Sequence, residues 1–501
     1  MRFNGKSIVG PIATCLRLFA VAVICAFSAD AVASGNFPTD QTQVAPTTVV
    51  VGADNPLYDV PAVQSAVDRG GTVLLRGTFD FGTDAGNHII VPGRTGAAQD
   101  VKGTSTVFIY QKDVTIKGET GQRGELLTVI KNGMPAFWIG WDGEVSRVQP
   151  SGTYGVDFGI EAFPVDVAGR VSYRDTGPES GYAGPQIRYA RAFQNVSVTI
   201  KTIFFDSPKG GIKAAAGRDI FVIGNVFSKV RFGGLVHLNT FAGATHIAAA
   251  FGGAGLFYAP FLYPTITGNI IAERNIVDDV GTDVIYTHAG ECFGLVALLT
   301  NAAAVRFERN EVRNVGRQAD DTGPNLLAAA GILVGDNYKA SPLVANNIVY
   351  NSTLNGIWDL VAAAPTPGPT IVNNKLVNCV IGIKSESVVG PRDGVLIHQN
   401  SISQDGLLGS GQSCIVASQL SGALIRANRF EGDYAGPLVM LSSSINNVLL
   451  ENRDLRSTDL PEPPTYFLDA SSSGNLVMGA SGTAQDTGTN NKIFLHGPGG
   501  K

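Results

Sequence analysis

The segments LVANNIVYNSTLNGIWDL (343–360) and TIVNNKLVNCVIGIKSES (370–387) decide the fold of this chain. In both, an apolar stretch is followed by an Asn, one further residue and another apolar residue. This signature occurs eight times, at Asn225, Asn275, Asn310, Asn347, Asn374, Asn400, Asn428 and Asn452. The intervals between these Asn residues are 50, 35, 37, 27, 26, 28 and 24 residues. One unit is therefore about 25 residues long, and some units carry insertions. Because so short a unit cannot bury its apolar face alone, the copies are expected to stack as a solenoid.

Alignment on the Asn residues shows two more features of the unit. Four residues further on lies a column of mostly amide or acid side chains: Lys229, Asp279, Asn314, Asn351, Asn378 and Gln404. A second short strand follows, usually opened by Gly, as in GIWD (356–359) and GIKS (382–385). We therefore predict a unit of strand, Asn turn, strand, Gly turn and strand, paired in parallel at about 4.8 Å with its neighbours. Stacked Asn amides can bond the backbone and the Asn one coil away, so their predicted role is structural.

The two ends of the chain have different predicted roles. Residues 1–33 are typical of a signal peptide, because Arg2, Lys6 and Arg17 precede an apolar run (18–27) and AVA (31–33) supplies a cleavage site. The run is too short to span a bilayer comfortably, so we expect export, secreted or periplasmic, with no integral membrane segment after removal of the signal. Residues 34–56 are predicted as a linker, 57–478 as the solenoid and 479–501 as a flexible tail, although KIFLH (492–496) is compatible with one last strand.

Composition excludes some functions. A formal net charge of −5 argues against nucleic acid or an anionic membrane as a partner. Cys292, Cys379 and Cys414 remain after signal removal, an odd number without a CxxC spacing, and are predicted to be small core residues. The six His show no HxH or HExxH pairing, so the sequence gives no support for a zinc site.

The start of the mature chain predicts a cap for the solenoid. DVPAVQSAVDRGG (59–71) places Val60, Val63 and Val67 at helical spacing, and TVLLRGTFDF (72–81) then takes a strand pattern. A short amphipathic helix at this position would cover the open end of a stack of strands, whose edge otherwise promotes aggregation.

The stretch DVPAVQSAVDRGGTVLLRGTFDFG (59–82) resembles the N-terminal cap of the pectate-lyase-like (pectin lyase-like) superfamily. The later units are similar to the repeats of that superfamily, and the resemblance covers most of residues 57–478. It implies an all-β fold: a single-stranded, right-handed parallel β-helix with a short N-terminal capping helix. It does not specify a reaction, since the same scaffold also carries non-catalytic surface proteins.

In that superfamily, substrates usually bind along the outer face of the short Gly-initiated strands. If Ile332, Ile357, Ile383 and Ile415 point inward, each following residue points outward. The predicted outward column is Val236, Ile285, Leu333, Trp358, Lys384, Val416 and Val439. Its polar or aromatic members, Trp358 and Lys384, lie on adjacent coils. The residues that follow these strands add His288, Asp336, Asp359 and Glu386 to one predicted patch.

Each residue of the patch has a candidate role in handling a saccharide. Trp358 offers a flat apolar face for a sugar ring. In a lyase, Lys384 is the candidate base or charge stabiliser, with Arg426 or Arg429 assisting. In a glycoside hydrolase, Asp336, Asp359 and Glu386 are the candidate acids, and His288 lies in the same patch. The alternative is a set of ordinary solvated turn residues beside one exposed Trp.

Two other regions compete with this patch. The predicted insertion at 131–195 is rich in aromatic residues, including Trp138 and Trp141, and either forms the wall of a binding cleft or shields the flank of the solenoid. Asp278, Asp279 and Asp283, and separately Asp320 and Asp321, are the candidates for Ca²⁺. Since no EF-hand or nonapeptide pattern accompanies them, no metal-binding residue is assigned.

No intact hydrolase or lyase signature is present. The sequence therefore predicts an exported protein that binds, and in its enzymatic version cleaves, an acidic or neutral polysaccharide. The rival hypothesis is a non-enzymatic surface or periplasmic β-helix that binds glycans or protein partners. The outward column favours this rival because most of its members are apolar.

Overall fold

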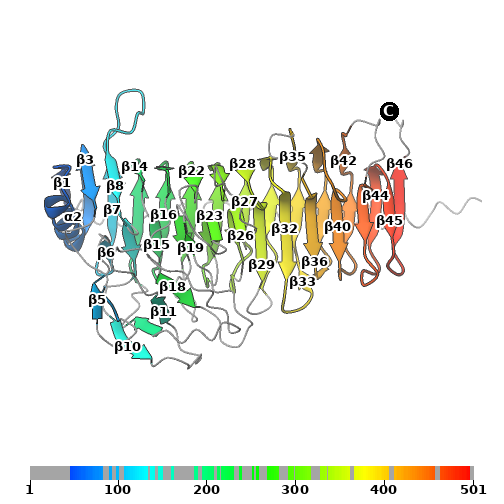
Figure 1. Cartoon of the computed structure of the whole chain (residues 1–501), viewed down its shortest axis with the longest axis horizontal. Helices are drawn as coiled ribbons and strands as arrows, with labels where there is room; N and C mark the ends of the chain where they lie inside the picture. Colours follow the sequence, from blue (N-terminus) through cyan, green and yellow to red (C-terminus); the bar gives the residue numbers. More distant parts are fainter. Residues whose placement is uncertain are drawn as a thin grey trace, which may run out of the picture. The chain divides into compact units, whose positions relative to one another are not determined.

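The computed structural model describes residues 46–82, 90–92, 98–100, 106–133, 136–140, 145–149, 159–162, 186–189, 195–207, 211–214, 216–230, 236–239, 251–252, 256–258, 268–280, 291–297, 300–316, 328–335, 337–361, 366–405, 411–456 and 463–496. The predicted signal peptide (1–33) and the first part of the predicted linker (34–45) lie outside this set. The unit from Pro46 onward is a stack of coils, coloured along the chain in Figure 1.

The coil stack begins with a helical cap, as predicted. Helix α2 (Pro56–Arg69) starts at Asn55, whose side-chain Oδ1 accepts a hydrogen bond from the Leu57 N–H at 3.0 Å, and Pro56 occupies its first turn. It ends at Gly70, whose positive φ of 74° suits glycine. The buried face of the helix consists of Asp59, Val60, Val63, Ala66 and Val67.

Three long parallel sheets form the walls of the stack. The first has 14 strands: β1 (Thr47–Val51), β2 (Gly71–Arg76), β7 (Val114–Gly118), β13 (Val198–Lys201), β16 (Ile220–Ile223), β21 (Asn269–Glu273), β24 (Ala304–Glu308), β27 (Leu343–Ala345), β30 (Thr370–Val372), β34 (Leu396–His398), β38 (Leu424–Arg426), β41 (Val448–Leu450), β44 (Leu476–Ser481) and β46 (Lys492–His496). All of its neighbouring strands pair in parallel, from β1 with β2 to β44 with β46.

The second sheet has 11 strands: β3 (Thr78–Phe81), β8 (Val129–Asn132), β14 (Phe204–Asp206), β17 (Val226–Ser228), β22 (Ile276–Val280), β25 (Glu311–Val315), β28 (Ile348–Ser352), β31 (Lys375–Val377), β35 (Ser401–Ser403), β39 (Arg429–Glu431) and β42 (Arg453–Asp454). Each of its strands follows a strand of the first sheet, and from β17 onward a ladder Asn lies in the turn between them.

The third sheet has 13 strands: β6 (Val107–Ile109), β9 (Phe137–Ile139), β15 (Ile212–Ala214), β20 (Leu256–Tyr258), β23 (Glu291–Ala297), β26 (Ala328–Val334), β29 (Asn355–Val361), β32 (Ile381–Ser387), β36 (Ser413–Ser418), β40 (Val439–Ser442), β43 (Tyr466–Leu468), β45 (Ala484–Asp486) and β19 (Phe251–Gly252), which pairs with β23. The predicted unit of three strands and two turns, and with it the parallel β-helix implied by the resemblance, is confirmed.

The eight Asn residues form a continuous buried ladder at the first turn. In one step, the Asn347 backbone N–H and side-chain Nδ2 both donate to Asn374 Oδ1, at 2.9 and 3.0 Å. Asn347 Nδ2 also donates to the Phe307 carbonyl at 2.8 Å. The same pattern runs from Asn225 to Asn452, and every member is at most 1% exposed. The ladder thus satisfies backbone groups that the turn removes from the sheets.

Backbone conformation explains the polar columns of the turns. The residue before each ladder Asn has φ between 52° and 62°, a list that comprises Gly224, Arg274, Arg309, Asn346, Asn373, Gln399, Ala427 and Glu451. The predicted amide and acid column is also left-handed at Lys229, Asp279, Asn314, Asn351 and Asn378. Among residues with a Cβ, Asn and Asp tolerate this conformation best, so their recurrence here reflects the turn.

Three predicted boundaries differ from the structure. Strand β1 lies inside the predicted linker (34–56), and β45 lies inside the predicted flexible tail (479–501), in which KIFLH (492–496) forms β46 as the sequence allowed. Strands β8 and β9 still belong to the solenoid, so the insertion predicted for 131–195 begins only after Ile139. Val236, predicted in a solenoid strand, lies in β18 (Val236–Asn239), which joins β10 (Val145–Gln149), β12 (Gln186–Tyr189) and β11 (Gly159–Ala162) in an antiparallel sheet.

Two small sheets complete the described strands: β33 (Arg392–Asp393) pairs with β37 (Leu420–Ser421), and β4 (Ile90–Pro92) pairs with β5 (Ala98–Asp100). No helix in the described part of the chain is both long enough and apolar enough to cross a membrane.

Candidate functional site

The predicted outward column on the 13-stranded sheet exists over its central strands. Leu333, Trp358, Lys384 and Val416 occupy equivalent positions on β26, β29, β32 and β36. Their neighbours Ile332, Ile357, Ile383 and Ile415 are fully buried and point into the core. In the next coil the column continues through Met440, because Val439 pairs with Ile415 and is buried. The prediction of Val439 was therefore wrong by one residue, and Ile285 lies outside the described residues.

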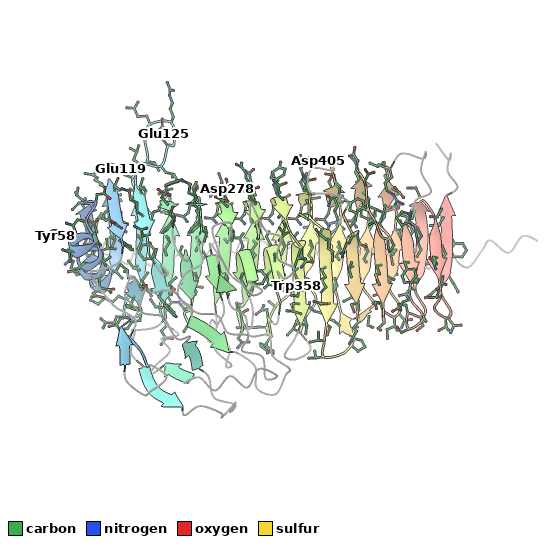
Figure 2. The ribbon with its side chains drawn as sticks, viewed as in Figure 1. Tyr58, Glu119, Glu125, Asp278, Trp358 and Asp405 are labelled. Atoms are coloured by element: carbon green, nitrogen blue, oxygen red, sulfur yellow. The ribbon has the colours of Figure 1, made fainter. Side chains whose placement is uncertain are left out.

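Trp358, Lys384 and Glu386 form a compact cluster on this face. The Trp358 indole Nε1–H donates to Glu386 Oε1 at 2.9 Å, and Lys384 Nζ lies 2.8 Å from the same carboxylate oxygen. Lys384 Nζ also lies 5.1 Å from the centroid of the Trp358 ring. All three side chains are half-buried, and Figure 2 labels Trp358 on the solenoid. Trp358, Lys384 and Glu386 are the part of the predicted patch that the structure brings together.

The outer face changes character at Trp358. Before it, Phe108, Trp138, Phe293, Val296 and Leu333 are at most 5% exposed. Phe293 packs against Trp358 with ring centroids 6.3 Å apart. From Trp358 onward, Lys384, Val416, Met440 and Phe467 are partly exposed. Ligand access to the described part of this face is therefore greatest from β29 to β45, where Gln485 pairs with Phe467 and is exposed.

Trp138 is not available to a ligand. It lies on β9, is fully buried and stacks on Phe108 with ring centroids 6.5 Å apart. Its predicted role in the wall of a cleft was therefore wrong: Trp138 lies in a strand of the solenoid itself and not in the insertion. Trp141 lies outside the described residues.

Asp359 is on the opposite side of the sheet from the cluster. As the residue after Trp358 in an extended strand, it points inward and is fully buried. Its carboxylate accepts hydrogen bonds from Arg392 Nη1 and from Ser385 Oγ, the latter at 2.6 Å. Burial raises the pKa of the Asp359 carboxyl, while the charge of Arg392 and the two hydrogen bonds oppose that shift. The prediction that Asp359 joins an exposed patch was wrong.

Arg392 was not singled out from the sequence. It is 1% exposed and donates to the Thr366 and Pro367 carbonyls, at 3.3 and 2.7 Å, as well as to Asp359. Its setting in PRDG (391–394) is typical of a solvated turn. The one available signal is that Asp359, an inward position, requires a buried cation or hydrogen-bond donors nearby.

Arg426 and Arg429 lie on other walls of the solenoid. Arg426 is on β38 of the 14-stranded sheet, where its Nε lies 3.4 Å from Glu451 Oε2, and Arg429 is on β39 of the 11-stranded sheet. Because Lys384 is on the third sheet, the predicted assistance of these arginines to Lys384 is not supported by their placement. His288 and Asp336 lie outside the described residues.

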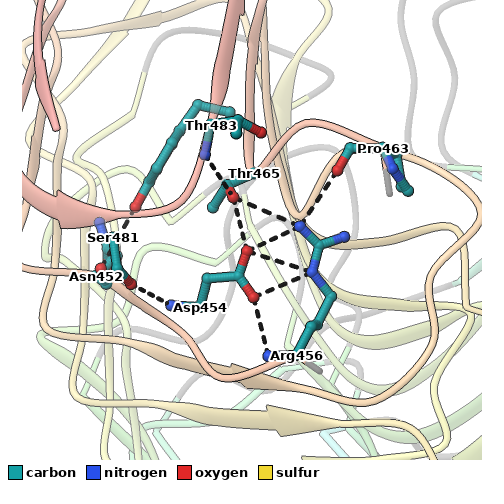
Figure 3. Close-up of polar contacts among 8 residues, drawn as sticks. Asn452, Asp454, Arg456, Pro463, Thr465, Ser481 and Thr483 are labelled. Atoms are coloured by element: carbon teal, nitrogen blue, oxygen red, sulfur yellow. Dashed lines mark hydrogen bonds and ion pairs between the residues drawn. The ribbon is translucent and has the colours of Figure 1, made fainter. Parts of the chain in front are cut away.

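A second, partly buried ion pair lies among the C-terminal coils (Figure 3). Arg456 Nη2 donates to Asp454 Oδ2 at 2.8 Å, and Thr465 Oγ1 donates to the same oxygen at 2.7 Å. Burial acts to raise the pKa of Asp454, but the bonds from Arg456 and Thr465 outweigh it and lower that pKa. Through the bonds to Thr465 and to the Pro463 carbonyl, the pair holds the end of β42 against the segment before β43.

The described residues contain neither a metal-binding cluster nor a reactive thiol among the free cysteines. No group of three or more His, Cys, Asp or Glu in the described ranges is arranged to hold a metal ion. Asp283, Asp320 and Asp321, from the predicted calcium clusters, lie outside those ranges, and Asp278 accepts a hydrogen bond from Asn314 Nδ2 at 2.8 Å. Cys379 and Cys414 are buried free thiols, as predicted, and burial raises the pKa of Cys379 to about 12.

No protein-family model and no curated protein matches this chain. Similar solved structures include the A-module of the Azotobacter vinelandii mannuronan C-5 epimerase AlgE4, with 12% identity over 89% of this chain and 96% of that chain and a TM-score of 0.44. A mutant tailspike protein of E. coli bacteriophage HK620 in complex with a pentasaccharide shares 13% identity over 87% and 76%, at a TM-score of 0.42. The Streptococcus pneumoniae surface protein and adhesin PfbA shares 11% over 90% and 98%, at a TM-score of 0.36. Likenesses of this degree do not identify a substrate or an activity.

Proposed function

We propose that this protein binds a polysaccharide on the outer face of the 13-stranded sheet, around Trp358, Lys384 and Glu386. The observation that carries the proposal is the cluster itself: on a partly exposed surface, the Glu386 carboxylate lies within hydrogen-bond distance of both the Trp358 indole N–H and the Lys384 ammonium group, which is also near the Trp358 ring. Carbohydrate sites commonly need this combination, because a sugar ring has apolar C–H faces and a rim of hydroxyl groups.

The cluster offers both kinds of polar partner to a hydroxyl group. Glu386 accepts hydrogen bonds, and Lys384 donates them. Since each sugar hydroxyl is both donor and acceptor, neighbouring hydroxyls can bond Lys384 and Glu386 at once. The Lys384 side chain is long and 27% exposed, so its ammonium group can leave the Trp358 ring when a sugar approaches.

Binding is better supported than cleavage. Hydrolysis requires two carboxyl groups on either side of the scissile bond, whereas Asp359 is sealed in the core and Asp336 is not described. A lyase with Lys384 as base would require a second cation to stabilise the developing charge, and Arg426 and Arg429 lie on other sheets. We further propose export, on the strength of the predicted signal peptide (1–33) alone.

The test is a binding assay with a panel of soluble polysaccharides and a matched pair of variants. Trp358→Ala is expected to weaken binding by about tenfold or more, equivalent to about 1.4 kcal/mol. Tyr350→Ala is the control, since Tyr350 is a half-buried ring on the 11-stranded sheet with Lys375 Nζ 5.9 Å from its centroid. Binding that is equally strong in both variants, or no binding to any polysaccharide, contradicts the proposal.

The same samples are assayed for cleavage. New reducing ends report hydrolysis, and ultraviolet absorbance of unsaturated ends reports lyase activity. Binding without either signal is the expected result. Cleavage abolished by Lys384→Ala would instead place Lys384 in a catalytic centre.

A further inference from the structure

The open part of the outer face carries almost no charge. Five of its strands, β29, β32, β36, β40 and β43, carry the outward column Trp358, Lys384, Val416, Met440 and Phe467, which continues to the uncharged Gln485 on β45. Lys384 is the only Lys or Arg in these five strands. Its ammonium group is already paired with Glu386 at 2.8 Å. The described column therefore presents one neutralised cation among apolar side chains.

A second outward column adds negative charge. It runs through Leu360, Glu386, Ser418 and Ser442, and Ser442 Oγ donates to Asp469 Oδ2 at 2.8 Å. Burial acts to raise the pKa of Asp469, but hydrogen bonds from Ser472, Ser442, Ser443 and Ser471 together lower it. Asp469 is therefore ionised at neutral pH, and the described face carries two carboxylates for one ammonium group.

We infer that the ligand of this face is a neutral, linear polysaccharide, an inference that rests on the proposed function. The apolar faces of successive sugar rings lie on Trp358, Val416, Met440 and Phe467. Their hydroxyl groups bond to Lys384, Glu386 and Ser418. Because coils repeat at about 4.8 Å, an extended glycan that runs along the solenoid meets a new outward side chain at roughly each sugar.

Electrostatics argues against an acidic polysaccharide here. A polyuronate places a carboxylate on each sugar, and each carboxylate removed from water needs a cation or several donors. Glu386 and Asp469 would repel a carboxylate of the ligand. The charge of Lys384 is largely neutralised by its ion pair with Glu386, so Lys384 would attract that carboxylate only weakly. Neutral hydroxyls carry no such cost.

The experiment measures the dissociation constants of neutral and uronic-acid oligosaccharides of equal length. The probes are linear β-glucan, mannan and galactan fragments, and fragments of polygalacturonate and polymannuronate, each at low and high salt. The expected result is at least about tenfold tighter binding of one neutral series than of either acidic series, unchanged by salt. Trp358→Ala is expected to weaken every neutral ligand at least tenfold, and Phe467→Ala only those long enough to span the five strands.

A gain-of-function variant keeps the inference testable if Trp358→Ala fails to fold. Val416→Lys adds an unpaired cation beside Lys384 and is expected to raise affinity for the acidic series several-fold, with a new salt dependence. Thermal melting curves of each variant, with Tyr350→Ala as control, report whether the fold is intact.

The outcomes separate the two proposals. Tighter, salt-sensitive binding of a uronic-acid series that Trp358→Ala abolishes overturns the neutral ligand and leaves the proposed site standing. Neutral binding that survives both Trp358→Ala and Phe467→Ala overturns the ligand path along this face. No binding of either class overturns both.

Discussion

Two acid–base pairs lie on opposite faces of the 13-stranded sheet at β29 and β32, and they differ in what surrounds them. On the outside, Lys384 and Glu386 are 27% and 18% exposed and share their contact with Trp358. On the inside, Arg392 and Asp359 are 1% and 0% exposed. An exposed pair contributes little to stability and remains open to a ligand, whereas a buried pair is costly to break. Adjacent residues, Trp358 and Asp359, thus have different surroundings: we propose that Trp358 serves binding, while Asp359 is part of the folded interior.

The largest expected effect comes from breaking the inner pair. Arg392→Met leaves the Asp359 carboxylate buried without its cation and the Pro367 carbonyl without its donor. It is expected to lower the free energy of unfolding by about 3–5 kcal/mol. The double variant Asp359→Leu/Arg392→Met should recover much of that loss. Urea denaturation of the three proteins measures both values, and a double variant as unstable as the single one would contradict this role.

The Asn ladder is the next strongest test of the interior. The Asn374 side chain accepts from the Asn347 N–H and Nδ2, and donates to Val344 O and Asn400 Oδ1. Asn374→Ala should cost about 3 kcal/mol, because several buried groups lose their partners. Asn373→Gly is the matched control: this neighbour is exposed with a φ of 54°, and its substitution should change stability by less than about 0.5 kcal/mol. Equal losses of stability in both variants would contradict a special role for the ladder Asn residues.

The outer pair is expected to matter for binding and hardly for stability. Lys384→Met removes the ion pair with Glu386 and the contact with the Trp358 ring, yet keeps an apolar stem over the ring. We expect a stability change below about 1 kcal/mol and a measurable loss of affinity for the neutral oligosaccharide. Denaturation and titration of the same preparation separate the two. A loss of stability comparable to that of Arg392→Met would show that the outer pair is also part of the core.

The smallest effect concerns pH. Since the pKa of Asp469 is lowered in the folded state, its contribution is fully present above the unfolded pKa of about 4 and is lost as pH falls through the folded value. Stability of the wild type should therefore fall with decreasing pH in this range. Asp469→Asn should make that decline shallower, as measured by urea midpoints at a series of pH values. An unchanged slope would mean that the serine hydrogen bonds do not hold the proton off Asp469.

Periodicity alone predicted most of the fold. A ladder of Asn residues at intervals near one coil, with a strand on either side, leaves parallel stacking as the physically reasonable solution, and the three sheets follow it. The limits of the stack were less predictable. Strands β1 and β45 have no Asn before them and are bounded by Gly, Thr or Pro, so they resembled linker and tail, whereas β46 follows Asn491 and was compatible with a strand.

The site was predicted in part for the same reason. Alternation in a strand placed Trp358 and Lys384 outward correctly, because Ile357 and Ile383 are unambiguous core residues. The same alternation turns Asp359 inward, but Asp359 was predicted in the exposed patch, because a carboxylate is expected inside only where a buried cation such as Arg392 is known. Arg426 and Arg429 were misassigned because closeness along the chain says nothing about which of three walls a residue occupies. Met440 was missed because Leu438, rather than a Gly, precedes the inward residue of that strand.

Hydroxyl-radical footprinting with a bound neutral oligosaccharide tests the central claim most directly. Trp358, Met440 and Phe467 are oxidisable side chains along the proposed path, and Met478 and Phe494, which are 36% and 58% exposed, lie on the 14-stranded sheet. We predict that the ligand slows oxidation of Trp358, Met440 and Phe467 and leaves Met478 and Phe494 unchanged. Protection of Met478 and Phe494 in place of the other three would contradict the claim that this face of the solenoid binds the polysaccharide.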